Sequence, residues 1–132
     1  MKKQSILLVD DEPEILETTK WAFEMNGYQV FTAANGAEAL QWVQNSHPNV
    51  LLIDYKLPKM TGIELLQAVR ASDHRVPAII ITGLTQDVDR VEAECQAAGA
   101  FAFLRKPLRM EEVLQTVKEA LAHRAKRPTK PR

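Results

Sequence analysis

The chain has 132 residues, of which 45% are hydrophobic and 26% charged, and its formal net charge is zero. This size and composition favour one compact domain and exclude a collagen-like, low-complexity or disordered chain. The apolar runs are far shorter than the roughly 18–20 residues that cross a bilayer, and the run after Lys2-Lys3 is too short for a secretion signal. A single cysteine, Cys95, forms no internal disulfide, so we expect a cytoplasmic protein without membrane association.

The charge is unevenly distributed along the chain. Residues 121–132 contain five of the 17 Lys and Arg residues and no Asp or Glu, so residues 1–120 have a net charge of −5. An acidic body argues against direct nucleic-acid binding by the domain, which would need a basic surface. We expect a basic tail or linker over residues 123–132, after the folded domain.

Five apolar segments with the character of strands alternate with segments of helical periodicity. The predicted strands are residues 5–10, 28–33, 49–54, 76–82 and 101–104. Three of them are nearly continuous runs of Ile, Val and Leu, which is typical of strands buried on both faces of a parallel sheet. The segment 28–33 has a more mixed composition, so we expect it at an edge of the sheet.

The helical segments are bounded by residues that favour helix ends. Pro13 suits the first turn of a helix over about 13–26, and Gly27 suits the left-handed position that follows it. Further helices are predicted from Gly36 to His47-Pro48, over 62–71, from a cap at Asp87 to Gly99, and from Met110 through Leu121. This alternation predicts a three-layer α/β fold with an open parallel sheet, in which ligands bind at the carboxyl ends of the strands.

Polar residues occur at that edge of the predicted sheet. They are Asp10 and Asp11 after the first strand, Asp54 at the end of the third, Thr82 at the end of the fourth, and Lys106 after the fifth. Three carboxylates at about 5 Å repel one another by roughly 3 kcal/mol per pair, so a hard divalent cation such as Mg²⁺ would be expected among them. With an ammonium and a hydroxyl beside it, this set predicts phosphoryl transfer to a carboxylate. Asp54 is the best candidate for the carboxylate that attacks phosphorus, because it ends a central strand.

Four segments in this order resemble one known family. They are ILLVDDE, LLIDYKLPKMTG, IIITG and FLRKP. The chain resembles the receiver domain of two-component response regulators, of the chemotaxis-regulator type, over about residues 4–122. The resemblance implies a flavodoxin-like (βα)5 fold with strand order 2-1-3-4-5. It also implies phosphorylation by the phosphohistidine of a sensor histidine kinase or phosphotransfer protein, with Mg²⁺, or Mn²⁺ in its place, as cofactor.

The resemblance carries functional roles to individual residues of this chain. These are the phosphoacceptor Asp54, the metal ligands Asp10, Asp11, Asp54 and the backbone carbonyl of Lys56, the phosphate-binding and switch residues Thr82, Lys106 and Phe103, and Pro107, whose preceding peptide bond is cis in the family. It further implies that phosphorylation changes the surface of the fourth helix, fifth strand and fifth helix, where a partner or a second copy would bind. Such a domain catalyses only its own phosphorylation and dephosphorylation.

Three alternatives are weighed against this interpretation. A flavin-binding electron carrier would need a phosphate-cradling loop where Asp10-Asp11-Glu12 stands. A phosphatase with an aspartyl-phosphate intermediate would have a second Asp in place of Lys56. A phosphorylation-independent interaction domain would have lost an acid or the lysine, yet all are present. Because neither Lys56 nor Leu84 offers a carboxylate or amide to orient water, we expect a phosphoryl group that persists for minutes or more.

Overall fold

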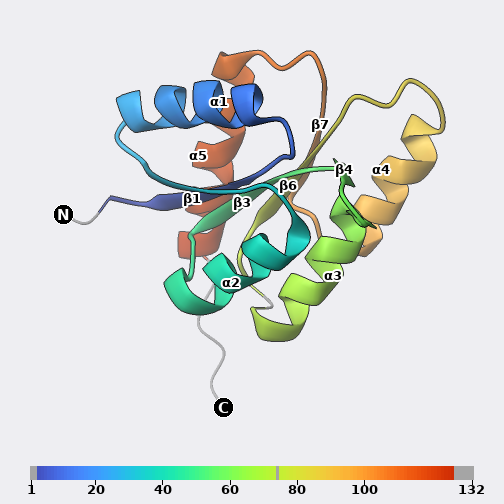
Figure 1. Ribbon diagram of the computed structural model, residues 1–132, viewed down its shortest axis with the longest axis horizontal. Helices are drawn as coiled ribbons and strands as arrows, with labels where there is room; N and C mark the ends of the chain where they lie inside the picture. Colours follow the sequence, from blue (N-terminus) through green and yellow to red (C-terminus); the bar gives the residue numbers. More distant parts are fainter. Residues whose placement is uncertain (1–2, 74, 127–132) are drawn as a thin grey trace.

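The computed structural model describes residues 3–73 and 75–126. Its main sheet has five parallel strands in the spatial order β2-β1-β3-β6-β7 (Figure 1). They are β1 (Ser5–Val9), β2 (Gln29–Ala33), β3 (Val50–Asp54), β6 (Ala78–Thr82) and β7 (Ala102–Arg105). Since β6 and β7 are the fourth and fifth strands of this sheet along the chain, the flavodoxin-like order 2-1-3-4-5 is confirmed. The predicted edge position of β2 is confirmed as well.

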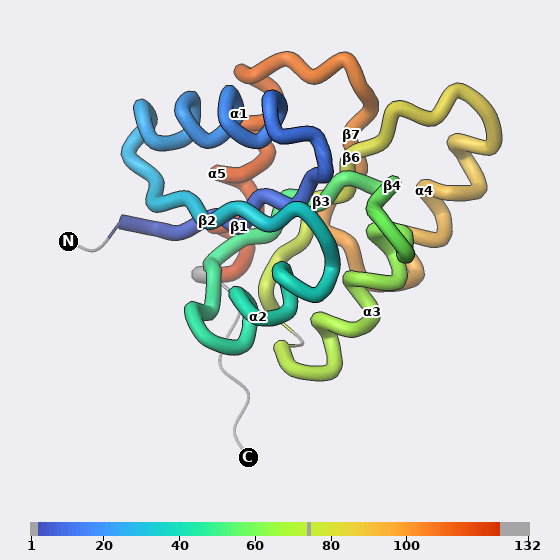
Figure 2. Tube along the Cα trace, viewed as in Figure 1, coloured from blue at the N-terminus to red at the C-terminus, as the bar shows by residue number. Residues whose placement is uncertain are grey.

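Within the residues that the structure describes, five helices complete the three layers. They are α1 (Pro13–Met25), α2 (Gly36–Ser46), α3 (Gly62–Ser72), α4 (Val88–Ala97) and α5 (Met110–Lys126). Helices α1 and α5 lie on one face of the sheet, and α2, α3 and α4 lie on the other (Figures 1 and 2). In the described part of the chain, no helix is both long and apolar enough to span a membrane.

Successive side chains along each strand point to opposite faces of the sheet, and this alternation produces two separate cores. In β1, Ile6 and Leu8 pack on the face that holds Phe23 of α1 and the buried residues of α5. Leu7 and Val9 point to the other face, where they pack with α2, α3 and α4. All five residues of β1, β3 and β6 are buried, as expected for strands covered on both faces. These central strands therefore form a rigid base for the residues at their carboxyl ends.

The helix ends follow the predicted punctuation with one exception. Pro13 begins α1, and Gly27 and Gly99 have φ values of 91° and 92°, which favour glycine. Asp87 occupies the N-cap position of α4, but the prediction that its side chain caps the helix was wrong. Its backbone is left-handed, with φ of 56°, and its carboxylate lies 3.8 Å from Arg90 instead.

The connection from β3 to α3 contains a small hairpin that sequence reasoning missed. Strands β4 (Lys56–Leu57) and β5 (Met60–Thr61) pair antiparallel, with Lys59 in the turn at φ of 66°. The Thr61 hydroxyl accepts a hydrogen bond from the Glu64 N–H, and the Glu64 carboxylate accepts one from the Thr61 N–H. This capping box fixes the start of α3 and orders the chain that follows Asp54.

The final helix extends past the predicted end of the domain. Helix α5 continues to Lys126, and residues 127–132 of the predicted basic tail lie outside the described residues. The Arg124 guanidinium donates to the carbonyl oxygens of Pro48 and Asn49, at 3.5 and 3.3 Å, and the His123 ring lies against Phe101. The first part of the basic segment is therefore helical and contacts the loop between α2 and β3.

Candidate functional site

The parallel register brings the ends of separate strands to one edge of the sheet. Val9 lies beside Ile53, so Asp10 and Asp54 follow at neighbouring positions. Asp54 lies beside Ile81, and Thr82 is the next residue of β6. Lys106 directly follows β7, whose Arg105 pairs with Thr82. The predicted clustering of polar side chains therefore results from the strand order and register.

Three carboxylates form a group that could hold a cation. Asp10, Asp11 and Asp54 each offer an oxygen, and these oxygens all lie within 4.8 Å of one another. Asp10 and Asp54 are buried and Asp11 is exposed, and Asp10 Oδ1 accepts a hydrogen bond of 2.9 Å from the Glu12 N–H. Clustered carboxylate oxygens fit Mg²⁺, which binds through one or two carboxylates and otherwise keeps water.

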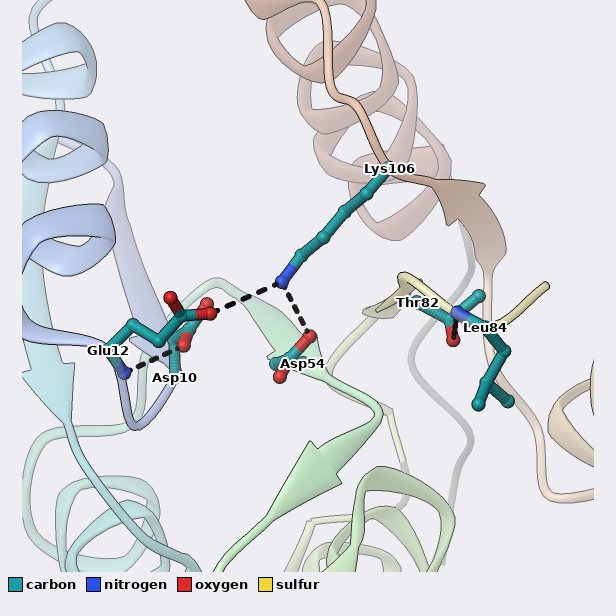
Figure 3. A network of polar contacts seen from close by, with 6 residues as sticks. All are labelled: Asp10, Glu12, Asp54, Thr82, Leu84 and Lys106. Atoms are coloured by element: carbon teal, nitrogen blue, oxygen red, sulfur yellow. Dashed lines mark hydrogen bonds and ion pairs between the residues drawn. The ribbon is translucent and has the colours of Figure 1, made fainter.

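Lys106 places a positive charge directly against the central carboxylate. Its Nζ lies 3.3 Å from Asp54 Oδ1 and 4.0 Å from Glu12 Oε1 (Figure 3). Burial alone would lower the pKa of Lys106, but the negative charges of Asp54, Asp10 and Glu12 outweigh it, so the pKa is raised. Lys106 is therefore fully protonated at neutral pH.

Asp54 is an unusual carboxylate. Burial raises its pKa and the Asp10 charge raises it further, so that it reaches about 6 although Lys106 acts in the opposite direction. At this carboxylate, burial and the charge of Asp10 together outweigh the ammonium of Lys106. An additional cation at the carboxylate cluster would restore the ionised form, which is the form able to act as a nucleophile.

Thr82 lies beside this centre, whereas Phe103 lies further back on β7, where it pairs with Ile80 of β6. The Thr82 side chain is buried, and its Oγ1 accepts a hydrogen bond of 3.0 Å from the Leu84 N–H, on the side of Asp54 away from Glu12 (Figure 3). Phe103 is half-buried on β7 and packs against the core formed with α2, α3 and α4. The peptide bond between Lys106 and Pro107 is cis.

The site opens into a shallow bowl of about 690 Å³. Its lining residues are Asp11, Glu12, Asp54, Lys56, Leu57, Pro58, Thr82, Gly83, Leu84 and Lys106. The bowl therefore brings Lys56 of the β4–β5 hairpin to the same space as Asp11 and Asp54. Sequence reasoning assigned no role to Glu12, although its position directly after Asp10-Asp11 was a signal that it would lie at the rim.

Comparisons with known proteins identify the family. A family model described as the response regulator receiver domain matches residues 6–118. Sporulation initiation phosphotransferase F of Bacillus subtilis is 36% identical over 121 residues, which cover 92% of this chain and 96% of that protein. The transcriptional regulatory protein KdpE of Mycobacterium tuberculosis is 36% identical over 116 residues, and the chain spans only 50% of its length.

Solved structures agree with this result. A CheY-like response regulator receiver domain protein from Methanospirillum hungatei has a TM-score of 0.88 and 35% sequence identity, covering 95% of this chain and 98% of that one. The chemotaxis response regulator CheY4 of Vibrio cholerae has a TM-score of 0.82 and 33% identity, covering 91% and 100%. With the order of strands and the acidic cluster already described, these matches show that the chain belongs to the response regulator receiver domain family.

Proposed function

We propose that Asp54 accepts a phosphoryl group from the phosphohistidine of a sensor histidine kinase or phosphotransfer protein. The observation that carries this proposal is the position of the Asp54 carboxylate. One of its oxygens lies within 4.8 Å of carboxylate oxygens of Asp10 and Asp11. Its Oδ1 lies 3.3 Å from the Lys106 ammonium. A single buried carboxylate therefore lies between a candidate cation site and a permanent positive charge.

The proposed reaction is an in-line displacement at phosphorus. An Asp54 oxygen forms the new P–O bond, and the P–N bond of the donor breaks with its electron pair remaining on the imidazole nitrogen. Lys106 is in position to pair with the phosphoryl oxygens as charge develops on them. The protein thus contributes alignment and charge compensation, and we propose that it catalyses only its own phosphorylation and dephosphorylation.

We propose that Mg²⁺ is held by Asp10, Asp11, Asp54 and the backbone carbonyl of Lys56, and that Mn²⁺ would fit the same oxygen ligands. Bound Mg²⁺ supplies positive charge to the carboxylates and to the phosphoryl oxygens. The residues present fit this role, since Asp10 and Asp54 are buried acids in mutual repulsion and Lys56 lines the same bowl.

The proposed output of phosphorylation is a change in the surface of α4, β7 and α5. A phosphoryl group adds roughly −1.5 to −2 charge with strong acceptor oxygens. The Thr82 hydroxyl, which now accepts from Leu84, would turn to donate to one of those oxygens, and Phe103 would move into the space that Thr82 leaves. A downstream effector, an output domain or a second copy of the chain would bind the altered surface.

The proposed functional unit is residues 4–122, with residues 123–132 as its basic tail or linker. We place its activity in the cytoplasm, among protein partners and without direct binding of nucleic acid or membrane by the receiver domain. The acidic balance of residues 1–120 supports protein partners over nucleic acid.

Incubation with acetyl phosphate, with and without Mg²⁺, tests the proposal by intact mass. We expect the wild-type chain to gain one phosphoryl group only when Mg²⁺ is present and the Asp54→Asn variant to gain none. A mass gain that survives the substitution would refute Asp54 as the acceptor. Complete absence of phosphorylation in the wild type would favour a phosphorylation-independent interaction domain.

A further inference from the structure

Glu12 occupies the N-cap position of α1 but does not cap it. Its φ and ψ are −96° and 109°, and its side chain makes no hydrogen bond to the helix. Ser, Thr, Asp and Asn are the residues that favour this position because their short side chains reach the first N–H groups. The Glu12 carboxylate instead extends across the bowl toward Lys106 (Figure 3).

Glu12 and Asp54 share one ammonium group. Lys106 Nζ lies 3.3 Å from Asp54 Oδ1 and 4.0 Å from Glu12 Oε1. The side chain of Lys106 is 28% exposed and that of Glu12 is 60% exposed, so Glu12 is the more solvent-accessible partner of this pair. A small phosphodonor that enters the bowl therefore meets the Glu12 charge close to the lysine that its phosphoryl oxygens would bind.

We infer that Glu12 is a specificity-determining residue that slows phosphorylation by small dianionic donors. It competes with the donor's phosphoryl group for Lys106 and repels the donor's negative charge. This inference rests on the proposed phosphorylation of Asp54. A protein donor would be affected less, because it covers the exposed Glu12 side chain and can offer its own positive charge to it.

The effect should be modest and should depend on charge. An ion pair with one exposed partner is weak, so its removal would change a rate by a small factor rather than abolish the reaction. At pH 7.5 acetyl phosphate is a dianion, whereas phosphoramidate carries a protonated nitrogen and one less negative charge. The repulsion is also screened by salt, since the Debye length falls to about 3 Å at 1 M ionic strength.

The test compares Glu12→Gln with Glu14→Gln. The Glu12→Gln variant loses the charge but keeps the backbone N–H that donates to Asp10. Glu14 is an exposed acid in the first turn of the same helix and serves as the matched control. Initial phosphorylation rates would be measured by intact mass with acetyl phosphate and with phosphoramidate, in Mg²⁺ at pH 7.5, at low and at high NaCl.

We expect Glu12→Gln to raise the rate with acetyl phosphate about 1.5- to fivefold, the rate factor of a weak, exposed ion pair, and the rate with phosphoramidate by a smaller factor. High salt should reduce the difference, and Glu14→Gln should change neither rate. A second variant, Glu12→Ser, removes the same charge and offers a short side chain able to cap α1. It should raise the rate of phosphorylation by acetyl phosphate in the same way. Its unfolding midpoint should be no lower than that of the wild type.

Each outcome separates this inference from the proposed function. The inference is wrong, and the proposed function stands, if Asp54 is phosphorylated but Glu12→Gln reacts no faster than the wild type. The same holds if Glu12→Gln raises the rates with acetyl phosphate and with phosphoramidate by equal factors. Equal acceleration by Glu14→Gln would also refute it, because the effect would then belong to the net charge of the helix. If the wild type accepts no phosphoryl group from either donor, the proposed function fails and this inference fails with it.

Discussion

Asp54 is held in a position that is unfavourable for its own charge. Its ordinary pKa is 3.8, and in the folded domain burial and Asp10 raise it to about 6. The folded domain therefore binds the Asp54 proton more tightly than the unfolded chain does. Protonation of Asp54 therefore adds to the free energy of unfolding. This contribution is fully present below about pH 4 and is lost as the pH rises through 6. At neutral pH, without a cation, Asp54 lowers the free energy of unfolding.

We therefore predict that Asp54→Asn stabilises the metal-free domain. At pH 7.5 in EDTA the free energy of unfolding should rise by about 1–3 kcal/mol, from one pKa unit being worth about 1.4 kcal/mol. The difference between the two proteins should shrink as pH falls toward 4. Urea unfolding measures both values, and Asp89→Asn, at an exposed position of α4, is the control. An Asp54→Asn protein that is less stable than the wild type at pH 7.5 would contradict this.

The second prediction at residue scale concerns the lifetime of the phosphoryl group. Lys56 and Leu84 line the bowl, and neither carries a carboxylate or amide that could orient an attacking water. After removal of the donor, the phosphorylated domain should therefore persist for minutes or more. Leu84→Gln should shorten the lifetime by about tenfold, below the roughly 10²–10⁴-fold effect of a full general base.

Decay of the intact mass over time measures this lifetime. Thr85→Gln, at the next exposed position of the same loop, is the control and should leave the lifetime unchanged. Loss of the phosphoryl group from the wild type within seconds would show that the protein positions water by some other residue.

At the scale of elements, the start of α3 is packed directly against the end of β3. A Cβ at Gly62 would lie 2.9 Å from the Asp54 carbonyl oxygen and 3.1 Å from both Ile53 Cγ2 and Tyr55 Cα. The Gly62 N–H also donates to the Tyr55 carbonyl. Two of the three atoms belong to the backbone, which cannot move aside as a flexible side chain would. The position of Asp54 therefore depends on a glycine in the following helix.

We predict that Gly62→Ala lowers the free energy of unfolding by about 1–3 kcal/mol, the usual cost of overpacking, and slows phosphorylation. Gly83→Ala is the matched control for stability, because a Cβ there would meet only Lys106 Cδ, at an ordinary 3.6 Å. Urea unfolding and initial phosphorylation rates with acetyl phosphate provide the two readouts. Equal tolerance of both substitutions would show that the contact between α3 and β3 is not tight.

At the scale of the whole molecule, hydrophobic periodicity and the positions of the strand ends were enough to predict the layers of the fold and the polar residues that cluster at one edge of the sheet. The apolar runs and the helix boundaries at Pro13 and Gly27 predicted the layers, and the carboxyl ends of the strands predicted which polar residues meet. The β4–β5 hairpin was missed because two-residue strands have no periodicity to detect. The contact of Glu12 with Lys106 was missed because it depends on a side-chain direction that spacing does not determine.

The extent of the folded unit differs from the extent of the proposed functional unit. Arg124 lies beyond residue 122, yet it donates to the carbonyl oxygens of Pro48 and Asn49. Asn49 precedes β3 and Asp54 ends it, so this contact lies about 17 Å from the candidate site, given about 3.3 Å per strand residue. Stability and phosphorylation should therefore respond separately to changes at the C-terminal end of α5.

We predict that Arg124→Met lowers the free energy of unfolding by about 1 kcal/mol, the net value of a typical hydrogen bond. Ending the chain after Ala122 should cost at least as much, since it also removes the His123 contact with Phe101. Lys118→Met, at an exposed position of α5, is the control for loss of charge. Phosphorylation by acetyl phosphate should be unchanged in all of these proteins. A chain ending at Ala122 that unfolds at the same urea concentration as the full chain would show that the Arg124 contact contributes nothing to stability.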